Sequence, residues 1–143
     1  MDLTRAAGRT ARCTAWLTGV VALAVSTHAS GAPQDPGTAA EAQFATFLRS
    51  FRRALADDDR DALASLTALP FQYESADLDA AAFRRIVPVL FPPAVRNCLA
   101  GAQPILEDGR YVIFCTPYGF YFGRVRGEFR LLEFMADGEA LEE

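Results

Sequence analysis

The 143-residue chain contains no lysine, and its single histidine and single tryptophan, His28 and Trp16, both lie near the amino terminus. All 14 basic residues are arginine, and 18 acidic residues give the chain a net charge of −4. An acidic chain without a basic run binds nucleic acid and anionic membrane surfaces poorly. The composition therefore argues against both kinds of partner.

Histidine does not occur after residue 28, and this excludes several chemistries from the rest of the chain. Ser-His and Cys-His nucleophile pairs need an imidazole, as do imidazole general bases and the usual zinc and copper sites. We therefore expect no metal site and no cofactor. An enzyme built from the remaining side chains would have to use carboxylates and phenols.

The amino-terminal segment has the three parts of a secretory signal. A head with three arginines precedes an apolar run over residues 14–26, and small residues follow the run. The run is shorter than the roughly 20 residues that a membrane-spanning helix needs. We expect cleavage after Ala29, or alternatively after Gly31, and a mature protein in the periplasm or outside the cell. Retention of the segment as a membrane anchor is the competing interpretation.

The predicted domain organisation follows from this signal. Residues 1–29 form the signal peptide, 30–37 a flexible linker, 38–137 a single domain and 138–143 an acidic tail. A domain of that length can bury one modest hydrophobic core. Cleavage would remove the only histidine and leave the mature domain without a membrane attachment.

Two cysteines, Cys98 and Cys115, follow the predicted signal. A pair of cysteines in an exported protein usually forms a disulfide, because the compartment outside the cytoplasm is oxidising. The sequence therefore predicts a Cys98–Cys115 disulfide. Two buried free thiols are the alternative.

The first part of the predicted domain has helical periodicity. Apolar side chains recur every three or four positions over residues 44–55, and Thr38 and Glu41 form a capping-box pattern before them. The acidic run at residues 57–59 ends this helix, and Asp59 is placed to cap a second one. Capping and turn formation explain the acidic run better than calcium binding, because no calcium-loop spacing follows it.

A third helix is predicted to begin at Asp77 or Asp79 and to stop at Pro88, because proline interrupts a helix interior. One further helical turn is predicted over residues 94–99, ending at Gly101. Arg96 lies on this turn, and we interpret it as a structural salt-bridge residue, with anion binding as the alternative.

The later part of the chain has the pattern of short strands separated by turns. Strands are predicted at residues 71–73, 104–106, 110–116, 120–126 and 128–135. Asp108-Gly109 is a hairpin turn signal, and Gly123 is a candidate bulge. Helices followed by consecutive hairpins indicate an α+β domain with N-terminal helices packed on an antiparallel sheet.

The order of these elements resembles the NTF2-like (SnoaL-like) superfamily of cone-shaped α+β domains. The resemblance rests on the segments FATFLRSFRRAL, DDDRDALASL, LPF and YFGRVRGEFRLLEF, and it points to a small exported bacterial member. It implies a strongly bent sheet that wraps a pocket against the first helix, and dimerisation through the open sheet face. Members of the superfamily include isomerases, hydratases and cyclases as well as proteins that bind ligands or other proteins.

Aromatic residues of the late strands are candidates to line a ligand pocket: Tyr111, Phe114, Tyr118 and Tyr121. Ordinary core packing is the alternative for these side chains. Our first hypothesis is that the protein is a non-catalytic binding domain for a small apolar ligand or a protein partner. It assigns no catalytic residue.

A second hypothesis is a cofactor-free isomerase or lyase that uses Glu133 and Tyr121. Apolar neighbours of Glu133 would raise its pKa by burial, and a tyrosine would donate a hydrogen bond to a developing oxyanion. The competing interpretation is an ordinary glutamate that faces solvent or is paired with an arginine, for instance Arg124 or Arg126 on the adjoining strand. A toxin-immunity protein is a third hypothesis, which the resemblance suggests.

Overall fold

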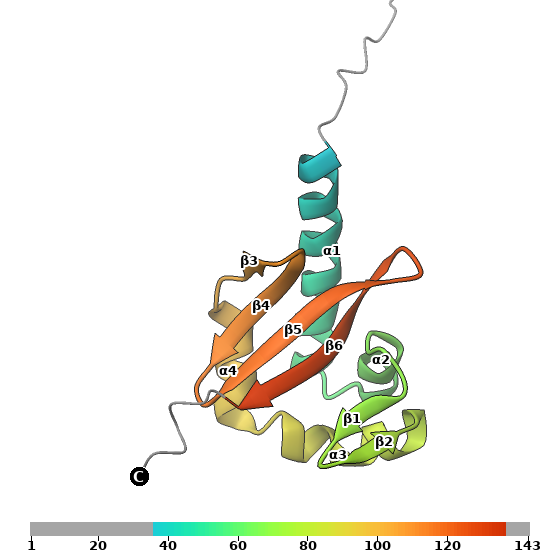
Figure 1. Ribbon diagram of the computed structural model, residues 1–143. Helices are drawn as coiled ribbons and strands as arrows, with labels where there is room; N and C mark the ends of the chain where they lie inside the picture. Colours follow the sequence, from blue (N-terminus) through green and yellow to red (C-terminus); the bar gives the residue numbers. More distant parts are fainter. Residues whose placement is uncertain (1–35, 137–143) are drawn as a thin grey trace, which may run out of the picture. The chain divides into compact units, whose positions relative to one another are not determined.

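The structure is a computed structural model, and it describes residues 36–136. The predicted signal peptide, with His28 and Trp16, and the predicted acidic tail lie outside the described residues. Within residues 36–136 the chain forms four helices and six strands, and three helices cover one side of the main sheet (Figure 1). This arrangement confirms the predicted α+β class.

The longest helix, α1 (Pro36–Ala56), is amphipathic and carries the apolar stripe that the spacing predicted. The buried members of this stripe are Phe44, Phe47, Leu48, Phe51 and Leu55. The prediction of Thr38 as the N-cap was wrong, because the helix already includes Pro36 and Gly37, which were assigned to the linker. Proline suits the first turn of a helix, where its fixed φ is helical and no N–H is needed.

The second helix, α2 (Arg60–Ser65), begins directly after the acidic turn. The Asp59 carboxylate accepts a hydrogen bond from the Ala62 N–H at 2.9 Å, so the predicted cap is confirmed. Asp58 has a φ of 51°, a left-handed conformation that aspartate tolerates better than most residues. The acidic run therefore forms the turn between α1 and α2.

The next two helices are longer than predicted. α3 spans Ala80–Leu90 and is capped by Asp79, whose carboxylate accepts from the Ala82 N–H at 2.8 Å. Pro88 does not end it, because a proline in the last turn removes only one backbone bond and the buried Leu90 anchors the helix beyond it. α4 spans Pro93–Gly101, so it is longer than the predicted single turn, but it ends at Gly101 as predicted.

Four antiparallel strands form the main sheet in the order β3-β4-β5-β6. Their bounds are Ile105–Glu107, Arg110–Cys115, Tyr118–Val125 and Glu128–Ala136. Asp108 and Gly109 have φ values of 48° and 78°, which confirms the predicted hairpin turn with positive φ at both positions. Arg126 and Gly127, at 52° and 86°, form the same kind of turn between β5 and β6.

A second, two-stranded sheet lies between α2 and α3 in the chain. β1 (Phe71–Tyr73) was predicted, whereas its partner β2 (Ala76–Leu78) was not. The sequence Ala-Asp-Leu has little strand propensity. The strand forms because the positive-φ residues Glu74 and Ser75 turn the chain back onto β1.

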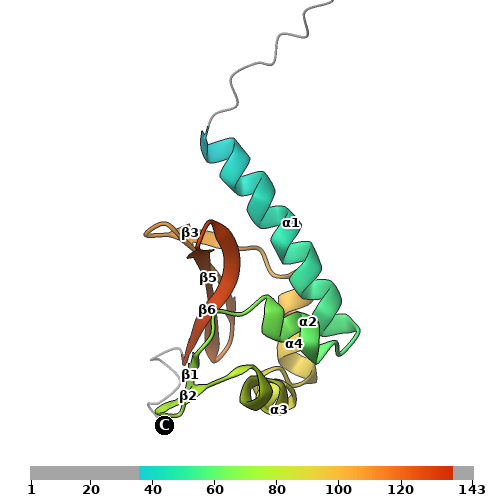
Figure 2. The same cartoon turned by 90° about the vertical axis from the view of Figure 1, so that its right-hand side faces the viewer.

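Helices α1, α2 and α4 lie on one side of the main sheet, and the other side carries no helix of residues 36–136 (Figure 2). Phenylalanines fill the space between the layers, and for six of them no surface is exposed: Phe51, Phe71, Phe83, Phe91, Phe120 and Phe122. The rings of Phe51 on α1 and Phe122 on β5 meet edge to face at 5.3 Å. We call the helix side of the sheet the inner face and the opposite side the outer face.

The bulge of the main sheet lies at Leu132 on β6 and not at the predicted Gly123. Tyr121 pairs with Glu133 and Phe122 with Leu131, so Leu132 is the extra residue. A Cβ at Gly123 would lie 2.7 Å from Leu132 Cδ1. The glycine thus provides the space into which the bulged leucine packs.

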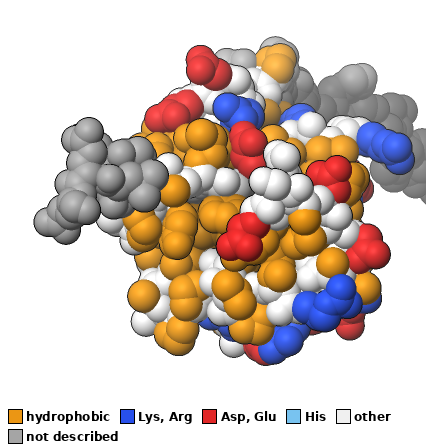
Figure 3. All heavy atoms as spheres, turned by 60° about the horizontal axis from the view of Figure 1, so that its bottom comes forward, with side chains coloured by type: hydrophobic (Ala, Val, Ile, Leu, Met, Phe, Trp, Pro, Cys, Tyr) orange, Lys and Arg blue, Asp and Glu red, His pale blue; other side chains and the backbone are white. Residues whose placement is uncertain are grey.

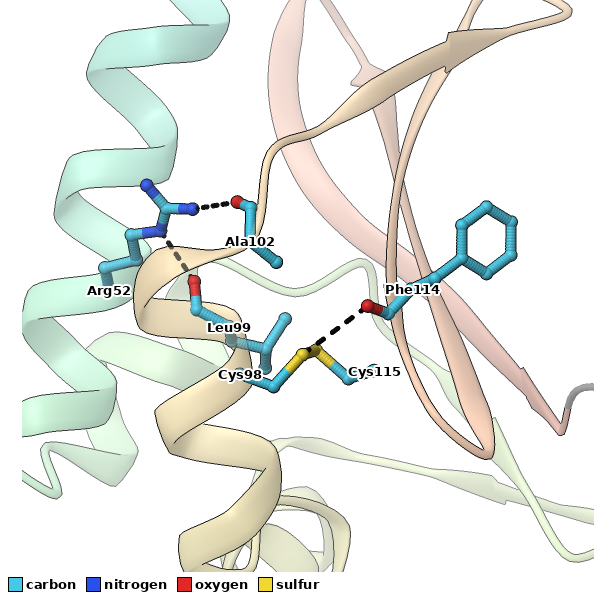
Figure 4. The surroundings of a disulfide bond; sticks show 6 residues. All are labelled: Arg52, Cys98, Leu99, Ala102, Phe114 and Cys115. Carbon is cyan, nitrogen blue, oxygen red and sulfur yellow. Dashed lines mark hydrogen bonds between the residues drawn. A yellow bond between two sulfur atoms is a disulfide. The ribbon is translucent and has the colours of Figure 1, made fainter.

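The predicted disulfide is present between Cys98 on α4 and Cys115 on β4, with Cα atoms 5.7 Å apart. On α1, Arg52 donates to the carbonyl oxygens of Leu99 and Ala102, at the end of α4 (Figure 4). The bridge and the arginine together hold α4 between α1 and the sheet.

Candidate functional site: the outer face of the sheet

The four aromatic residues proposed for a ligand pocket lie on two opposite faces of the sheet. Tyr111 faces inward and stacks on Phe44 of α1, with ring centroids 3.7 Å apart and an interplanar angle of 2°. Tyr118 also faces inward, directly opposite Cys115 in the register. Phe114 and Tyr121 face outward, so the four side chains do not surround one cavity.

Strand alternation explains this separation. Successive residues of a strand point to opposite faces, so two residues of one strand share a face only when their numbers differ by an even amount. Tyr111 and Phe114 differ by three, as do Tyr118 and Tyr121. This parity was visible in the sequence and would have divided the predicted pocket set.

Large apolar side chains of three strands are exposed on the outer face. Ile105 of β3, Phe114 of β4 and Met135 of β6 have exposed fractions of 50%, 42% and 53%. The register places them on the outer face, because Ile105 is opposite Val112 and Met135 is opposite Gly119. Figure 3 looks obliquely onto this side and the adjoining end of the domain, where apolar side chains form a broad area with few charged groups within it.

The centre of the outer face is smooth because Gly119 has no side chain. A Cβ at this position would lie 3.2 Å from Phe114 Cε1 and 3.3 Å from Tyr121 Cε2. The two aromatic rings therefore cover the glycine from either side. Together they form a continuous apolar surface across β4 and β5.

Glu133 and Tyr121, the candidate catalytic pair, are cross-strand neighbours on this face. The Glu133 carboxylate is bound to Arg110 at 2.6 Å, and its side chain is 44% exposed. The Arg110 guanidinium lies 5.0 Å from the centre of the Tyr121 ring and thus passes over β5 to reach β6. Glu133 therefore lacks the burial on which the isomerase hypothesis depends.

Glu133 is paired with an arginine, as the competing interpretation held, but the partner is Arg110 and neither Arg124 nor Arg126. Arg124 points to the inner face, where it lies over the Phe129 ring at 4.5 Å and donates to the Gln43 side chain. Arg126 belongs to the β5–β6 turn. Arg110 lies on β4, which is not adjacent to β6 in the sheet. No local sequence pattern indicates a pairing across that distance.

Arg96 has the structural role predicted for it. It binds Asp58 at 2.6 Å and donates to the carbonyl oxygens of Phe91 and Leu55 at 2.7 and 2.8 Å. These bonds join the ends of α1 and α3 to α4. The hydrogen bond from Arg96 lowers the pKa of the Asp58 carboxyl below its ordinary value, against a smaller opposing effect of desolvation.

Residues 36–136 contain no group of three or more histidine, cysteine or carboxylate side chains that could hold a metal ion. In the same range, no helix has both the length and the apolar composition for crossing a membrane. Comparison of the chain with family models, curated proteins and solved structures gave no match.

Proposed function

We propose that this chain is an exported, non-catalytic binding domain of the NTF2-like type, and that its outer face binds a protein. The observation that carries the proposal is the exposure of Ile105, Phe114 and Met135 on one face of the sheet. Monomeric soluble proteins rarely expose contiguous apolar surface, and where they do it usually marks an interaction site.

The shape of the surface favours a protein over a small molecule. Small apolar ligands bind in concavities that cover most of their surface. The outer face is an open sheet surface, and the centre of the inner face is filled by phenylalanine side chains such as Phe120 and Phe122, which have no exposed surface. An open surface that combines exposed apolar side chains, the aromatic rings of Phe114 and Tyr121, and Arg110 resembles protein interfaces in composition.

Two observations support export to the periplasm or the cell exterior. The apolar run of residues 14–26 is followed by small residues that suit signal cleavage. The Cys98–Cys115 disulfide is of a kind that persists in oxidising compartments and is rare in the reducing cytoplasm.

The fold supports the NTF2-like part of the proposal, because helices packed on one face of a twisted antiparallel sheet are the arrangement expected of an NTF2-like domain.

Site-specific photo-crosslinking tests the proposal. In one variant the photoreactive residue p-benzoylphenylalanine replaces Phe114 on the outer face. In the control variant it replaces Val89 on α3, which is 65% exposed and lies outside that face. Both variants are expressed in the cells that export the protein and are irradiated. We expect a discrete protein adduct from position 114 only, and loss of that adduct when Met135→Asp is added.

The identity of the adduct distinguishes the kinds of partner. A crosslink to a second copy of the chain would make the partner a homodimer mate, and a crosslink to a toxin would support the immunity hypothesis. Equal crosslinking from both positions, or no adduct from position 114, would contradict the proposed binding face.

A further inference from the structure

The free edge of β3 presents unpaired backbone groups. β3 is the end strand of the sheet, and within residues 36–136 no strand pairs with its other side. Glu107 and Arg110 flank the two-residue turn and form a hydrogen-bonded pair. In an antiparallel sheet, hydrogen-bonded and non-hydrogen-bonded pairs alternate along the strands. The next pair, Leu106 and Tyr111, is therefore a non-hydrogen-bonded pair. The N–H and C=O of Leu106 therefore point away from β4, toward the open edge.

The same strand exposes apolar side chains on both of its faces. Ile105, on the outer face, is 50% exposed, and Leu106, on the inner face, is 62% exposed. Edge strands are usually protected by charged side chains, prolines or a covering element. A strand added beside β3 would cover these exposed side chains on both faces, because its own side chains point alternately to one face and the other.

Two grooves run between α1 and this edge, on the inner side. One, of about 480 Å³, is lined by residues that include Ala40, Leu106 and Tyr111. The other, of about 390 Å³, is lined by residues that include Phe44, Pro104 and Tyr111. Tyr111 lines both grooves, so they meet at its ring and together form one trough beside Leu106, with apolar side chains and, in the first groove, Arg110 and Arg124.

The trough has an excess of positive charge at one end. Arg49 and Arg52 line it there, together with the single carboxylate of Glu41. Neither arginine forms an ion pair with a carboxylate of residues 36–136: Arg49 donates to Thr46, and Arg52 donates to backbone carbonyl oxygens. A side chain of negative charge in the trough would therefore find two guanidinium groups that no described carboxylate neutralises.

We propose that β3 accepts an extended segment of a partner protein as an added strand, with an apolar and an acidic residue two positions apart, so that both side chains face the trough. The backbone of the segment would pair with Leu106, an apolar side chain would enter the trough beside Tyr111, and an acidic side chain would reach Arg49 and Arg52. Strand addition of this kind derives affinity from main-chain bonds and specificity from pockets for alternate side chains. The backbone edge at Leu106 and the trough lie away from Phe114 and Met135, and only Ile105 is shared with the outer-face surface, so the inference does not rest on the proposed function.

Peptide binding to the full domain tests this inference. The probe is a fluorescent peptide of repeating Val-Thr-Glu-Thr, which places valine and glutamate on the same face of an added strand, and its affinity is measured by fluorescence anisotropy. Matched peptides carry lysine in place of glutamate, or N-methyl groups on alternate residues that block strand pairing. We expect the glutamate peptide to bind best and the N-methylated one to bind at least about tenfold more weakly, since it loses its main-chain hydrogen bonds.

Two substitutions at one position separate backbone from side-chain effects. Leu106→Pro removes the outward N–H, and an edge strand tolerates proline where its N–H faces solvent. Leu106→Ala keeps the N–H and shortens the side chain. We expect the proline variant to lose affinity about tenfold while it retains the unfolding temperature of the parent, and the alanine variant to lose less.

The outcomes are decisive in either direction. Increased protection of the Leu106 amide from hydrogen exchange on peptide addition, together with weaker binding by Arg49→Gln, would support strand addition. No binding at millimolar peptide, or equal binding of the pairing and N-methylated peptides, would overturn it. If Leu106→Pro does not fold, the N-methylated peptide makes the same test on the unaltered protein.

Discussion

Arg52 and Leu99 are joined across 47 positions of the chain by a hydrogen bond of 2.7 Å from the guanidinium Nε to the carbonyl oxygen. The same guanidinium donates to Ala102 at 2.5 Å. Both acceptors lie at the carboxyl end of α4, where helix carbonyl groups lack partners within the helix and the dipole favours a cation. Arg52 thus supplies, from α1, the cap that the sequence of α4 does not contain.

We expect Arg52→Met to lower the free energy of unfolding by about 1–3 kcal/mol, because two bonds from a charged donor are lost and the carbonyl groups remain half-buried. Urea unfolding provides the measurement. Arg53→Met is the matched control, since Arg53 lies next to it on α1 and is exposed. It should change stability by no more than about 0.5 kcal/mol. Equal effects of the two substitutions would contradict the capping role.

The Cys98–Cys115 bridge closes a loop with a sequence separation of 17. By the chain-entropy model, replacing both cysteines with serine should lower stability by about 3 kcal/mol. Urea unfolding of the oxidised parent and of the double variant measures this difference. Alkylation of the unreduced protein, followed by mass spectrometry, provides an independent check. Modification of both cysteines before reduction would show that the bridge does not form.

Asp58→Asn should change the pH dependence of stability. Because Arg96 holds the pKa of folded Asp58 below 3.8, the ordinary value, the contribution of this carboxylate is complete above that value and is lost as the pH falls through the folded-state pKa. We therefore expect Asp58→Asn to lower the melting temperature at pH 7, and the difference from the parent to shrink as the pH falls below about 4.

Asp57→Asn serves as the comparison for that experiment, because Asp57 is exposed in the same turn and forms none of the observed ion pairs. It should leave the melting temperature nearly unchanged at both pH values. A difference between Asp58→Asn and the parent that is constant from pH 7 to pH 2 would rule out ionisation of Asp58 as its cause.

Gly123→Ala should be destabilising by about 1–3 kcal/mol, because the new methyl group would overlap Leu132 Cδ1. Adding Leu132→Ala should recover part of this loss by removing the obstructing side chain, although that change has a cost of its own. Gly101→Ala is the control, since a Cβ at the end of α4 meets no atom within 4 Å. Differential scanning calorimetry on the parent, Gly123→Ala, Leu132→Ala, the double variant and Gly101→Ala gives the comparison, and non-additivity of the pair is the decisive quantity.

Those features of the fold that depend on local spacing were predictable from the sequence. The apolar stripe of α1, the cap at Asp59 and the turn at Asp108-Gly109 each depend on residues within a few positions of one another. The disulfide was predictable for a different reason, because only two cysteines follow the predicted signal. The errors at Pro36 and Pro88 arose because proline was treated as a boundary, although it fits the first turn and was tolerated in the last.

The candidate site depended on register, which local patterns do not specify. Arg110 meets Glu133 because β5 places the Tyr121 ring between their strands, and a one-residue shift would move these side chains to the other face. The bulge at Leu132 changes that register within β6 itself. By contrast, the separation of Tyr111 from Phe114 followed from strand alternation and was available in the sequence.

The bridge between α4 and β4 also determines how the domain carries mechanical load. A force applied to the two ends of the chain passes from Cys98 directly to Cys115 through the sulfur atoms, so the intervening residues, which include the whole of β3, carry no tension. The 17 steps from Cys98 to Cys115 span about 60 Å when extended, at roughly 3.5 Å per residue, and the bridge withholds all of that length except the 5.7 Å between the two Cα atoms. A reductant would release this length, and β3 would then become part of the stretched path.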